Sequence, residues 1–305
     1  MSQLPKREYN EAPLLIGYIP HGVNPDIFRK ITDPVEYEAD VVRHRTRLFG
    51  AVIPSFVVFY NNRNIRRKMT SDVLLAFATF WRTLPESQRN SVFMLMHTQP
   101  VDENGTDLPR VIEDVMPDVK QNIVFSTERL LPKDLNAVYN LSDVVINLAS
   151  NEGFGIGTLE GMMAERLMLA NVTGGLQDQM GFRDNDGNYL HEDIHFQEKW
   201  GSNHTGTYQT CGDWAFPVFP NNRSLNGSVP TPYIFDDRCD WNDAADQLRK
   251  IYDLPADERA RRGQLARVYA MEEGYNIAEM NNRFIAGFNH LLSTWTPRER
   301  FGVFQ

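Results

Sequence analysis

Residues 147–175 read NLASNEGFGIGTLEGMMAERLMLANVTGG, and the order of features in this stretch indicates the fold. An apolar run that begins before Asn147 leads to Glu152, a glycine-rich turn covers residues 153–157, and a segment with helical spacing starts near Thr158. In an open α/β sheet, ligands bind beyond the carboxyl ends of the strands, where a turn of this kind leads into a helix. The stretch therefore predicts a strand, a ligand-binding turn and a helix in succession.

The acidic residues on either side of the turn indicate what kind of ligand it would bind. Glycines let the backbone approach a ligand closely, and free N–H groups at the start of a helix suit a phosphate. Glu152 and Glu160 would both repel a phosphate, but each can accept hydrogen bonds from hydroxyl groups. A nucleotide sugar meets both conditions, because it has a diphosphate in the middle and hydroxyl groups on its sugar and on its ribose.

The densest group of basic residues follows another predicted strand. Residues 55–60 form that strand, and the next eight residues read NNRNIRRK, with Arg63 and Lys68 five positions apart. Cations at the end of a neighbouring strand could neutralise a diphosphate and stabilise its charge as it leaves. Short basic clusters are also common in solvated loops, so the spacing alone leaves both interpretations open.

Apolar runs alternate with segments of helical period along the first part of the chain, which is the pattern of a parallel sheet with helical crossovers. The predicted strands cover residues 14–19, 55–60, 92–97, 122–125, 144–148 and 167–170. Residues 177–240 show little periodicity and are predicted as an irregular insertion. From Trp241 onward only helices are predicted, the last with Phe284 and Phe288 on one face. The predicted fold class is α/β, a Rossmann-like doubly wound parallel sheet with an irregular insertion and C-terminal helices.

The composition excludes several classes of protein. The chain has 305 residues, of which 42% are hydrophobic and 23% charged, and this excludes wholesale disorder, a collagen and a coiled coil. A formal net charge of −9 argues against a protein that mainly binds nucleic acid or anionic lipid. No apolar run approaches the roughly 20 residues that span a bilayer, and Cys211 and Cys239 are too few for a disulfide framework. We therefore expect a cytoplasmic protein without stable membrane insertion.

Taken together, these segments resemble the donor-binding signature of the retaining GT-B-fold glycosyltransferases, the broad glycogen-synthase and mannosyltransferase-like group 1 class. The resemblance lies in Glu152 and Glu160 with seven residues between them, in the glycine pair at 174–175, and in Arg63 and Lys68. It covers residues 14–175 and implies a C-terminal, donor-binding domain.

Other pieces of the chain follow the order of that family. Residues 19–24 are similar to the linker that enters its C-terminal domain, and Leu135, Tyr139 and Asp143 fit the helix and strand before the two glutamates. The chain departs from the family at three positions, where Gly, Gly and Pro are usual: Asn62, Glu165 and Leu167.

The resemblance implies a role for each matching residue. The donor diphosphate would be bound by Arg63, Lys68, Gly155, Ile156, Gly157 and Thr158. The transferred sugar would be bound by Glu152, Gly153, Phe154 and Gly155. Glu152 would also be catalytic, and Glu160 would bind the ribose hydroxyls. The family transfers a sugar from a UDP- or GDP-linked donor with retention of anomeric configuration, without a cofactor or a bound metal, and its leaving phosphates stabilise a cationic transition state.

The resemblance also implies a domain organisation. Residues 1–24 would form an N-terminal tail and a linker-like strand, residues 25–295 the donor-binding domain with its insertion at about 177–240, and residues 296–305 a C-terminal tail. Family members carry an acceptor-binding domain of about 150 residues before the linker, a typical domain size. We expect that half to come from a partner chain, to be missing from a fragment, or to be replaced by the insertion. The acceptor, whether glycan, lipid, protein or nucleic acid, stays open.

Three other interpretations are compatible with the sequence. The chain could be a non-catalytic subunit that binds a nucleotide sugar, or that only scaffolds a partner acceptor domain. The segment from His191 through Glu192 to His195 matches the H-E-x-x-H motif of zinc proteases, although the turn-forming residues 184–188 argue against the long helix that this motif needs. The glycines of residues 153–157 could form a nicotinamide-dinucleotide turn, but their spacing is not G-x-G-x-x-G and they follow a late strand.

Overall fold

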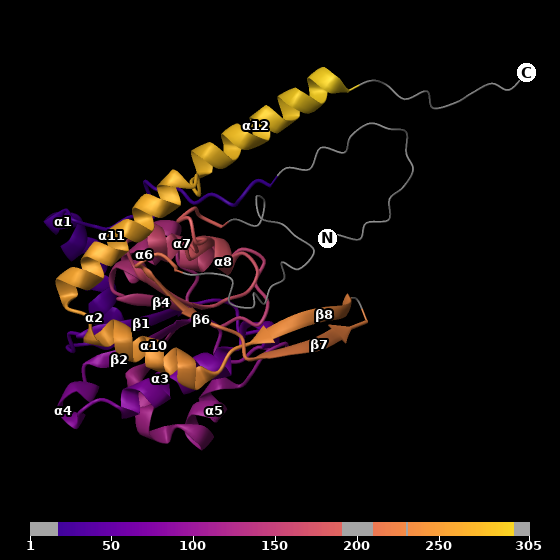
Figure 1. The fold of residues 1–305 in the computed structure, drawn as a ribbon. Coiled ribbons are helices and arrows are strands. Elements are labelled where there is room, and N and C mark those ends of the chain that lie inside the picture. The colour runs from indigo at the N-terminus through magenta and orange to yellow at the C-terminus, as the bar shows by residue number, and fades with distance from the viewer. Residues whose placement is uncertain (1–17, 191–209, 230, 296–305) are drawn as a thin grey trace, which may run out of the picture.

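Buried apolar runs form a six-stranded parallel sheet in the computed structural model, which describes residues 18–190, 210–229 and 231–295. The strands lie in the order β3-β2-β1-β4-β5-β6 (Figure 1). Their bounds are β1 (Phe56–Asn61), β2 (Val92–His97), β3 (Ile123–Ser126), β4 (Val144–Asn147), β5 (Leu167–Asn171) and β6 (Ala215–Val218). The predicted α/β class, a Rossmann-like parallel sheet, is confirmed.

The central strand β1 shows why these runs become strands and where they lead. All five residues from Phe56 to Tyr60 are buried. A parallel sheet is covered by helices on both faces, so its strands are continuous apolar runs and not alternating ones. The strand order reverses between β1 and β4, which pair with each other at Val58–Val144 and Phe59–Val145. This reversal brings the connections after β1 and β4 together at the carboxyl edge of the sheet.

Helices cover both faces of the sheet (Figure 1). One face carries α3 (Thr70–Arg82), α5 (Leu108–Val115) and α10 (Trp241–Asp253), with α10 packed along α3. The other carries α6 (Pro132–Asn140), α7 (Ile156–Met163) and α11 (Ala256–Glu272), and α11 contacts both α7 and β5. The sheet is therefore the middle layer of three.

Shorter helices lie in the connections. They are α1 (Pro34–Glu36), the π-helix η1 (Tyr37–Val42), α2 (Arg43–Phe49), the 3-10 helices η2 (Arg66–Lys68) and η3 (Pro117–Asn122), α4 (Glu86–Arg89) and α8 (Leu176–Gln179). Of these, η2 follows β1 at the carboxyl edge of the sheet.

An antiparallel hairpin follows β6 and projects from the body of the molecule (Figure 1). It consists of β7 (Asn222–Ser228) and β8 (Thr231–Arg238). Its base is bonded to the sheet: the Asp237 amide donates to the Ser150 carbonyl at 2.8 Å, and the Asn171 side chain donates to the Asp237 carbonyl at 2.7 Å. Arg238 also pairs with Asp72 on α3 at 3.1 Å. The hairpin is thus anchored beside the start of α3.

Contacts across most of the sequence join the first described residues to the last helices. The Val23 amide donates to the Tyr275 carbonyl and the Ile277 amide donates to the Val23 carbonyl, each at 3.0 Å. The Arg267 guanidinium on α11 donates to three carbonyl oxygens, those of Pro25 at 3.1 Å, Phe28 at 3.0 Å and Met163 at 2.6 Å. One side chain therefore fixes the segment before α1 to the end of α7.

The structure differs from the sequence-based expectations in several elements. Residues 14–17 of the strand expected at 14–19 lie outside the described residues, and residues 18 and 19 are not in a strand. The structure adds helices within residues 34–49, and it adds β6, β7 and β8 within 177–240. Pro217 weakens the strand signal of β6, but proline is tolerated there because β6 is an edge strand.

The last helix, α12 (Ile277–Thr294), has the predicted apolar stripe, but this stripe is not covered by described residues. Four of its members are 40% to 59% exposed: Ile277, Phe284, Phe288 and Leu291. Figure 1 shows α12 extending away from the sheet. Within the part of the chain that the structure describes, no helix is long and apolar enough to cross a membrane.

Candidate functional site

The two connections at the reversal of the strand order form the walls of a small cavity. The connection after β1 contributes η2, and the connection after β4 contributes the glycine-rich turn. The two are bonded together, because the Ser150 amide donates to the Arg67 carbonyl at 2.8 Å. A cavity of about 340 Å³ lies between them and is lined by His21, Asn62, Lys68, Glu152, Phe154, Gly155, Ile156 and Gly157.

This cavity brings together six of the residues that the sequence indicated. Lys68 comes from η2, Glu152 and Phe154 come from the turn, and Gly155, Ile156 and Gly157 come from the start of α7. Lys68 lies more than 80 positions before the other five in the sequence. A cation, a carboxylate and the amino end of a helix therefore meet at one place, as the strand-turn-helix pattern predicts for a ligand site.

A buried ion pair forms the centre of the site. The Lys68 ammonium contacts Glu152 Oε2, and both side chains are 9% exposed. Asn147 donates to the same carboxylate oxygen at 3.4 Å, and Arg67 Nη1 lies 3.8 Å from the other. Burial lowers the pKa of Lys68, and the neighbouring carboxylate of Glu152 opposes this change. Lys68 is the cation that lies closest to Glu152, so a ligand that engages one of these two charges must also leave the other one satisfied.

The backbone at the start of α7 needs glycine. Gly155 has φ 91°, a left-handed conformation that side chains disfavour, and a Cβ there would lie 2.5 Å from Leu176. Among the described residues, no side chain caps the start of this helix with a hydrogen bond. The first N–H groups of a helix have no partner within it, so those of Ile156 and Gly157 are available to an anion in the cavity.

The glycine pair downstream explains how the turn is kept in place. Gly174 has φ 48°, and a Cβ there would lie 1.9 Å from the Glu152 carbonyl oxygen. The Gly175 amide donates to that same oxygen at 3.2 Å. The pair therefore packs directly on the backbone of the turn, and this contact fixes the position of the Glu152 backbone.

Glu160 lies one turn further along α7 and is not among the residues that line the cavity. Its Oε2 accepts a hydrogen bond from the Tyr139 hydroxyl at 2.7 Å, and Asn61 Nδ2 lies 3.5 Å away. Burial raises the pKa of Glu160 to about 7, while the hydrogen bond from Tyr139 opposes the change. The carboxyl group therefore keeps its proton to a higher pH than an ordinary glutamate does.

Three further residues of the predicted site lie elsewhere. Arg63 is in an ion pair with Asp102, at 2.8 Å from Nε to Oδ2, and its side chain is 61% exposed. Thr158 is buried and donates to the Gly155 carbonyl at 2.6 Å. Gly153 is exposed beside the cavity but does not line it. The structure thus brings Lys68 to Glu152 and leaves Arg63 apart from them.

Three residues of the site had no role assigned by the sequence pattern. His21 lines the cavity and stacks edge-on against Phe154 at 5.1 Å between ring centroids. Asn62 lines it at the end of β1. Arg67 approaches Glu152, and its place in the NNRNIRRK segment was the only signal that could have marked it.

The possible zinc motif from His191 to His195 lies outside the described residues. Within residues 18–190, 210–229 and 231–295, no three His, Cys, Asp or Glu side chains gather where they could bind a metal ion.

Comparison with known proteins identifies the fold. No family model and no curated protein matches the sequence. Among solved structures, sucrose-phosphate synthase from Thermosynechococcus elongatus aligns with a TM-score of 0.59 and 17% identity over 91% of this chain and 53% of that one. A UDP-forming α,α-trehalose-phosphate synthase from Burkholderia vietnamiensis aligns with a TM-score of 0.56 and 14% identity over 89% and 51%.

A third structure resembles this chain over the whole of its own length. The C-terminal domain of a group 1 family glycosyltransferase from Francisella tularensis aligns with a TM-score of 0.50 and 14% identity over 84% of this chain and 100% of that one. The chain spans about half the length of the two synthases above. It therefore has the fold of the Rossmann-like domains found in GT-B glycosyltransferases.

Proposed function

We propose that this chain is the donor-binding part of a glycosyltransferase that takes a sugar from a nucleoside diphosphate and transfers it with retention of configuration. The observation that carries the proposal is the single cavity in which Lys68, Glu152 and the uncapped start of α7 meet. A fold shared with glycosyltransferases, one of them described as UDP-forming, supports it.

Each part of the donor would meet a suitable group. The diphosphate would lie at the amides of Ile156 and Gly157, with Lys68 as its counter-charge. When the bond between the sugar and the diphosphate breaks, negative charge grows on the phosphate oxygens, and these groups stabilise it without having to reorganise. Glu152 would release Lys68 and accept hydrogen bonds from the sugar hydroxyls, close to the reacting carbon.

Glu160 would bind the ribose. Its pKa of about 7 suits this role, because the carboxyl group can accept a hydrogen bond from a hydroxyl when ionised and is not strongly charged in the empty site. Arg63 would be a secondary contact, since its ion pair with Asp102 would have to break before it could bind the diphosphate. We also propose that the acceptor-binding half is supplied by a partner chain or by further sequence.

Titration calorimetry with UDP, GDP, UDP-glucose and GDP-mannose tests the proposal, because comparing each nucleotide with its sugar-linked form measures how much the sugar contributes to binding. We expect Glu152→Gln to bind the matching nucleotide sugar at least tenfold more weakly, since the sugar contact is lost, while it binds the nucleoside diphosphate as well as before or more tightly, since Lys68 is released from its ion pair. Lys68→Gln should lower the affinity for the nucleoside diphosphate and for the nucleotide sugar by at least tenfold, and Arg63→Gln should lower both affinities by less. Glu113→Gln, on the exposed face of α5, is the matched control.

Two results would contradict the proposal. One is the absence of binding by all four ligands to the unaltered chain. The other is an equal effect of Glu152→Gln on the nucleoside diphosphate and on its sugar, because that would place the carboxylate away from the transferred group.

A further inference from the structure

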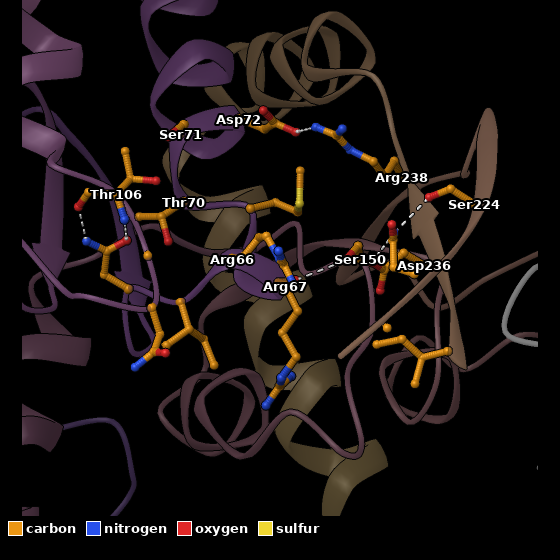
Figure 2. A pocket seen from close by; sticks show the side chains of 18 of the residues that line it. Arg66, Arg67, Thr70, Ser71, Asp72, Thr106, Ser150, Ser224, Asp236 and Arg238 are labelled. Atoms are coloured by element: carbon orange, nitrogen blue, oxygen red, sulfur yellow. Dashed lines mark hydrogen bonds and ion pairs between the residues drawn. The ribbon is translucent and has the colours of Figure 1, made fainter. Parts of the chain in front are cut away.

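A second, larger cavity lies on the other side of the connection that carries Lys68. Its volume is about 930 Å³, within the size range of small-molecule sites. Three segments enclose it: residues 64–72, which lead from β1 into α3, residues 103–106 after β2, and the hairpin of β7 and β8 (Figure 2). The hairpin closes the side away from the sheet, so the cavity exists only because this insertion is anchored beside α3.

Among the described residues, each basic side chain in the cavity wall has a protein partner, with one exception. Arg238 pairs with Asp72 at 3.1 Å, as Figure 2 shows, and Arg67 donates to the Asn151 carbonyl at 2.8 Å. Arg66 lines the same cavity, and within the described residues its guanidinium has no hydrogen bond and no ion pair. In a chain with a net charge of −9, an exposed guanidinium that lines a cavity and has no carboxylate partner among the described residues is suited to an anion from outside.

The opposite wall holds an acceptor that lacks a donor. Asp236 on β8 accepts a hydrogen bond from Asn226 at 2.6 Å through Oδ2. Its other oxygen, Oδ1, is buried and has no hydrogen-bond partner among the described residues. A buried carboxylate oxygen left without a donor costs free energy, and a ligand hydroxyl would remove that cost.

We propose that this cavity binds an anionic sugar, meaning a sugar ring that carries a phosphate or a carboxylate. The anion would pair with Arg66, and ring hydroxyls would donate to Asp236 and exchange hydrogen bonds with the hydroxyls of Ser71 and Ser224 in the same wall. A polyanion such as a nucleic acid does not fit, because Asp72, Asp236 and Glu103 line the cavity together with the arginines.

The site is separate from the cavity at Glu152, although the two share a wall. Arg67 and Ser150 line the larger cavity, while Lys68 and Glu152 line the smaller one. The inference concerns a ligand of its own and does not depend on the binding of a nucleotide sugar.

Calorimetric titration of the full chain without any nucleotide tests the proposal. Glucose 6-phosphate and glucuronate are the probes, and glucose and inorganic phosphate represent the two halves of the first. We expect at least one anionic sugar to bind ten times more tightly than either half, and its binding to weaken between 0.05 and 0.5 M salt, because the contact with Arg66 is ionic. Because no nucleotide is present, failure here and failure of the donor site are distinguishable.

Two variants assign the contacts. Arg66→Gln should lower the affinity for the anionic sugar and the affinity for inorganic phosphate by at least tenfold each. Asp236→Asn should bind the anionic sugar at least fivefold more weakly. It should bind inorganic phosphate equally or more tightly, because a negative charge is removed from the cavity wall. Arg82→Gln is the matched control, since it removes an exposed arginine at the far end of α3, about 18 Å away along a helix of 1.5 Å rise per residue.

The proposal is overturned if neither anionic sugar binds the unaltered chain. It is also overturned if Arg66→Gln binds the probe as tightly as the unaltered chain does. Arg66 is exposed, so we expect its variant to fold, and a circular dichroism melt identical to that of the unaltered chain checks this.

Discussion

Glu165 is held in a left-handed backbone conformation, with φ 60°, just after the end of α7. The Arg166 amide donates to the Gly161 carbonyl at 2.8 Å, and the Glu165 amide donates to that of Met162 at 3.0 Å, which is the bonding of a left-handed helix cap. Glycine is the usual residue in this conformation because it has no Cβ. Glu165 is also one of the positions where the resemblance noted above expects a glycine, and the backbone gives the physical reason.

We therefore expect Glu165→Gly to raise the free energy of unfolding by about 0.5–1 kcal/mol, because the strain of the left-handed conformation is removed. The loss of the ion pair with Lys30, 3.4 Å long, should offset little of this gain, since Glu165 Oε2 is buried and accepts no hydrogen bond among the described residues. Urea unfolding measures the change. Glu113→Gly in the interior of α5 is the control and should lower stability by about 1 kcal/mol, so a loss in both variants would contradict the explanation.

At the residue scale, spacing predicted part of the candidate site. Lys68, Glu152 and residues 154–157 could be predicted because each follows a strand of a parallel sheet, and topology alone brings them together. The direction of the Arg63 side chain could not be predicted, because it depends on Asp102 in the loop after β2. Neither Asp102 nor that loop carries a signal in the sequence.

At the scale of the secondary-structure elements, the tightest contact is the one between α11 and the residue that follows α7. A Cβ on Gly263 of α11 would lie 2.1 Å from the carbonyl oxygen of Glu165, which is backbone and cannot rotate away. A Cβ on Gly287 of α12 would have no neighbouring atom within 4 Å. The two glycines are both inside helices but differ in what they contact.

Gly263→Ala should therefore lower the free energy of unfolding by about 1–3 kcal/mol, because α11 must move away from α7. Gly287→Ala should raise it by about 0.5–1 kcal/mol, since alanine favours the helix and meets nothing. Denaturant titration of both variants checks the pair. A stabilising effect of Gly263→Ala would contradict the contact between the two helices.

Helices and strands could be predicted from the sequence where their residues are buried in the core. The runs expected at 92–97 and 144–148 form β2 and β4 with almost the same bounds, because continuous apolar runs are what a covered parallel sheet requires. β7 was not predicted, since NRSLNGS has no apolar alternation and its strand forms only through pairing with β8. The stripe on α12 was predicted from period alone, which cannot say whether a face is covered.

At the scale of the whole molecule, Glu160 links stability to pH. Its pKa is about 7 in the folded chain and 4.5 ordinarily, so between these values the folded state binds more protons than the unfolded state. The contribution of this group to stability therefore falls as pH rises from about 5 to 7.

Glu160→Gln removes this titration while keeping a side chain that can bond to Tyr139. At each pH, the measured quantity is the free energy of unfolding of the variant minus that of the unaltered chain. We expect this difference to increase by about 1–3 kcal/mol from pH 5 to pH 8, since each unit of pKa shift is worth about 1.4 kcal/mol. Urea titrations at several pH values measure it. Glu258→Gln should show no such trend over that range, because arginine neighbours lower the pKa of Glu258 to about 2. Parallel pH profiles for Glu160→Gln and the unaltered chain would rule out this origin.

The three hydrogen bonds of Arg267 have a consequence for synthesis. The side chain that fixes Pro25 and Phe28 to α7 is made about 240 positions after them. During translation the segment that holds these two residues must wait undocked until α11 has emerged from the exit tunnel. A late stage in the folding of this domain is then the joining of two segments that the ribosome makes far apart in time, and a chaperone that acts on this domain would find its target in the earlier one.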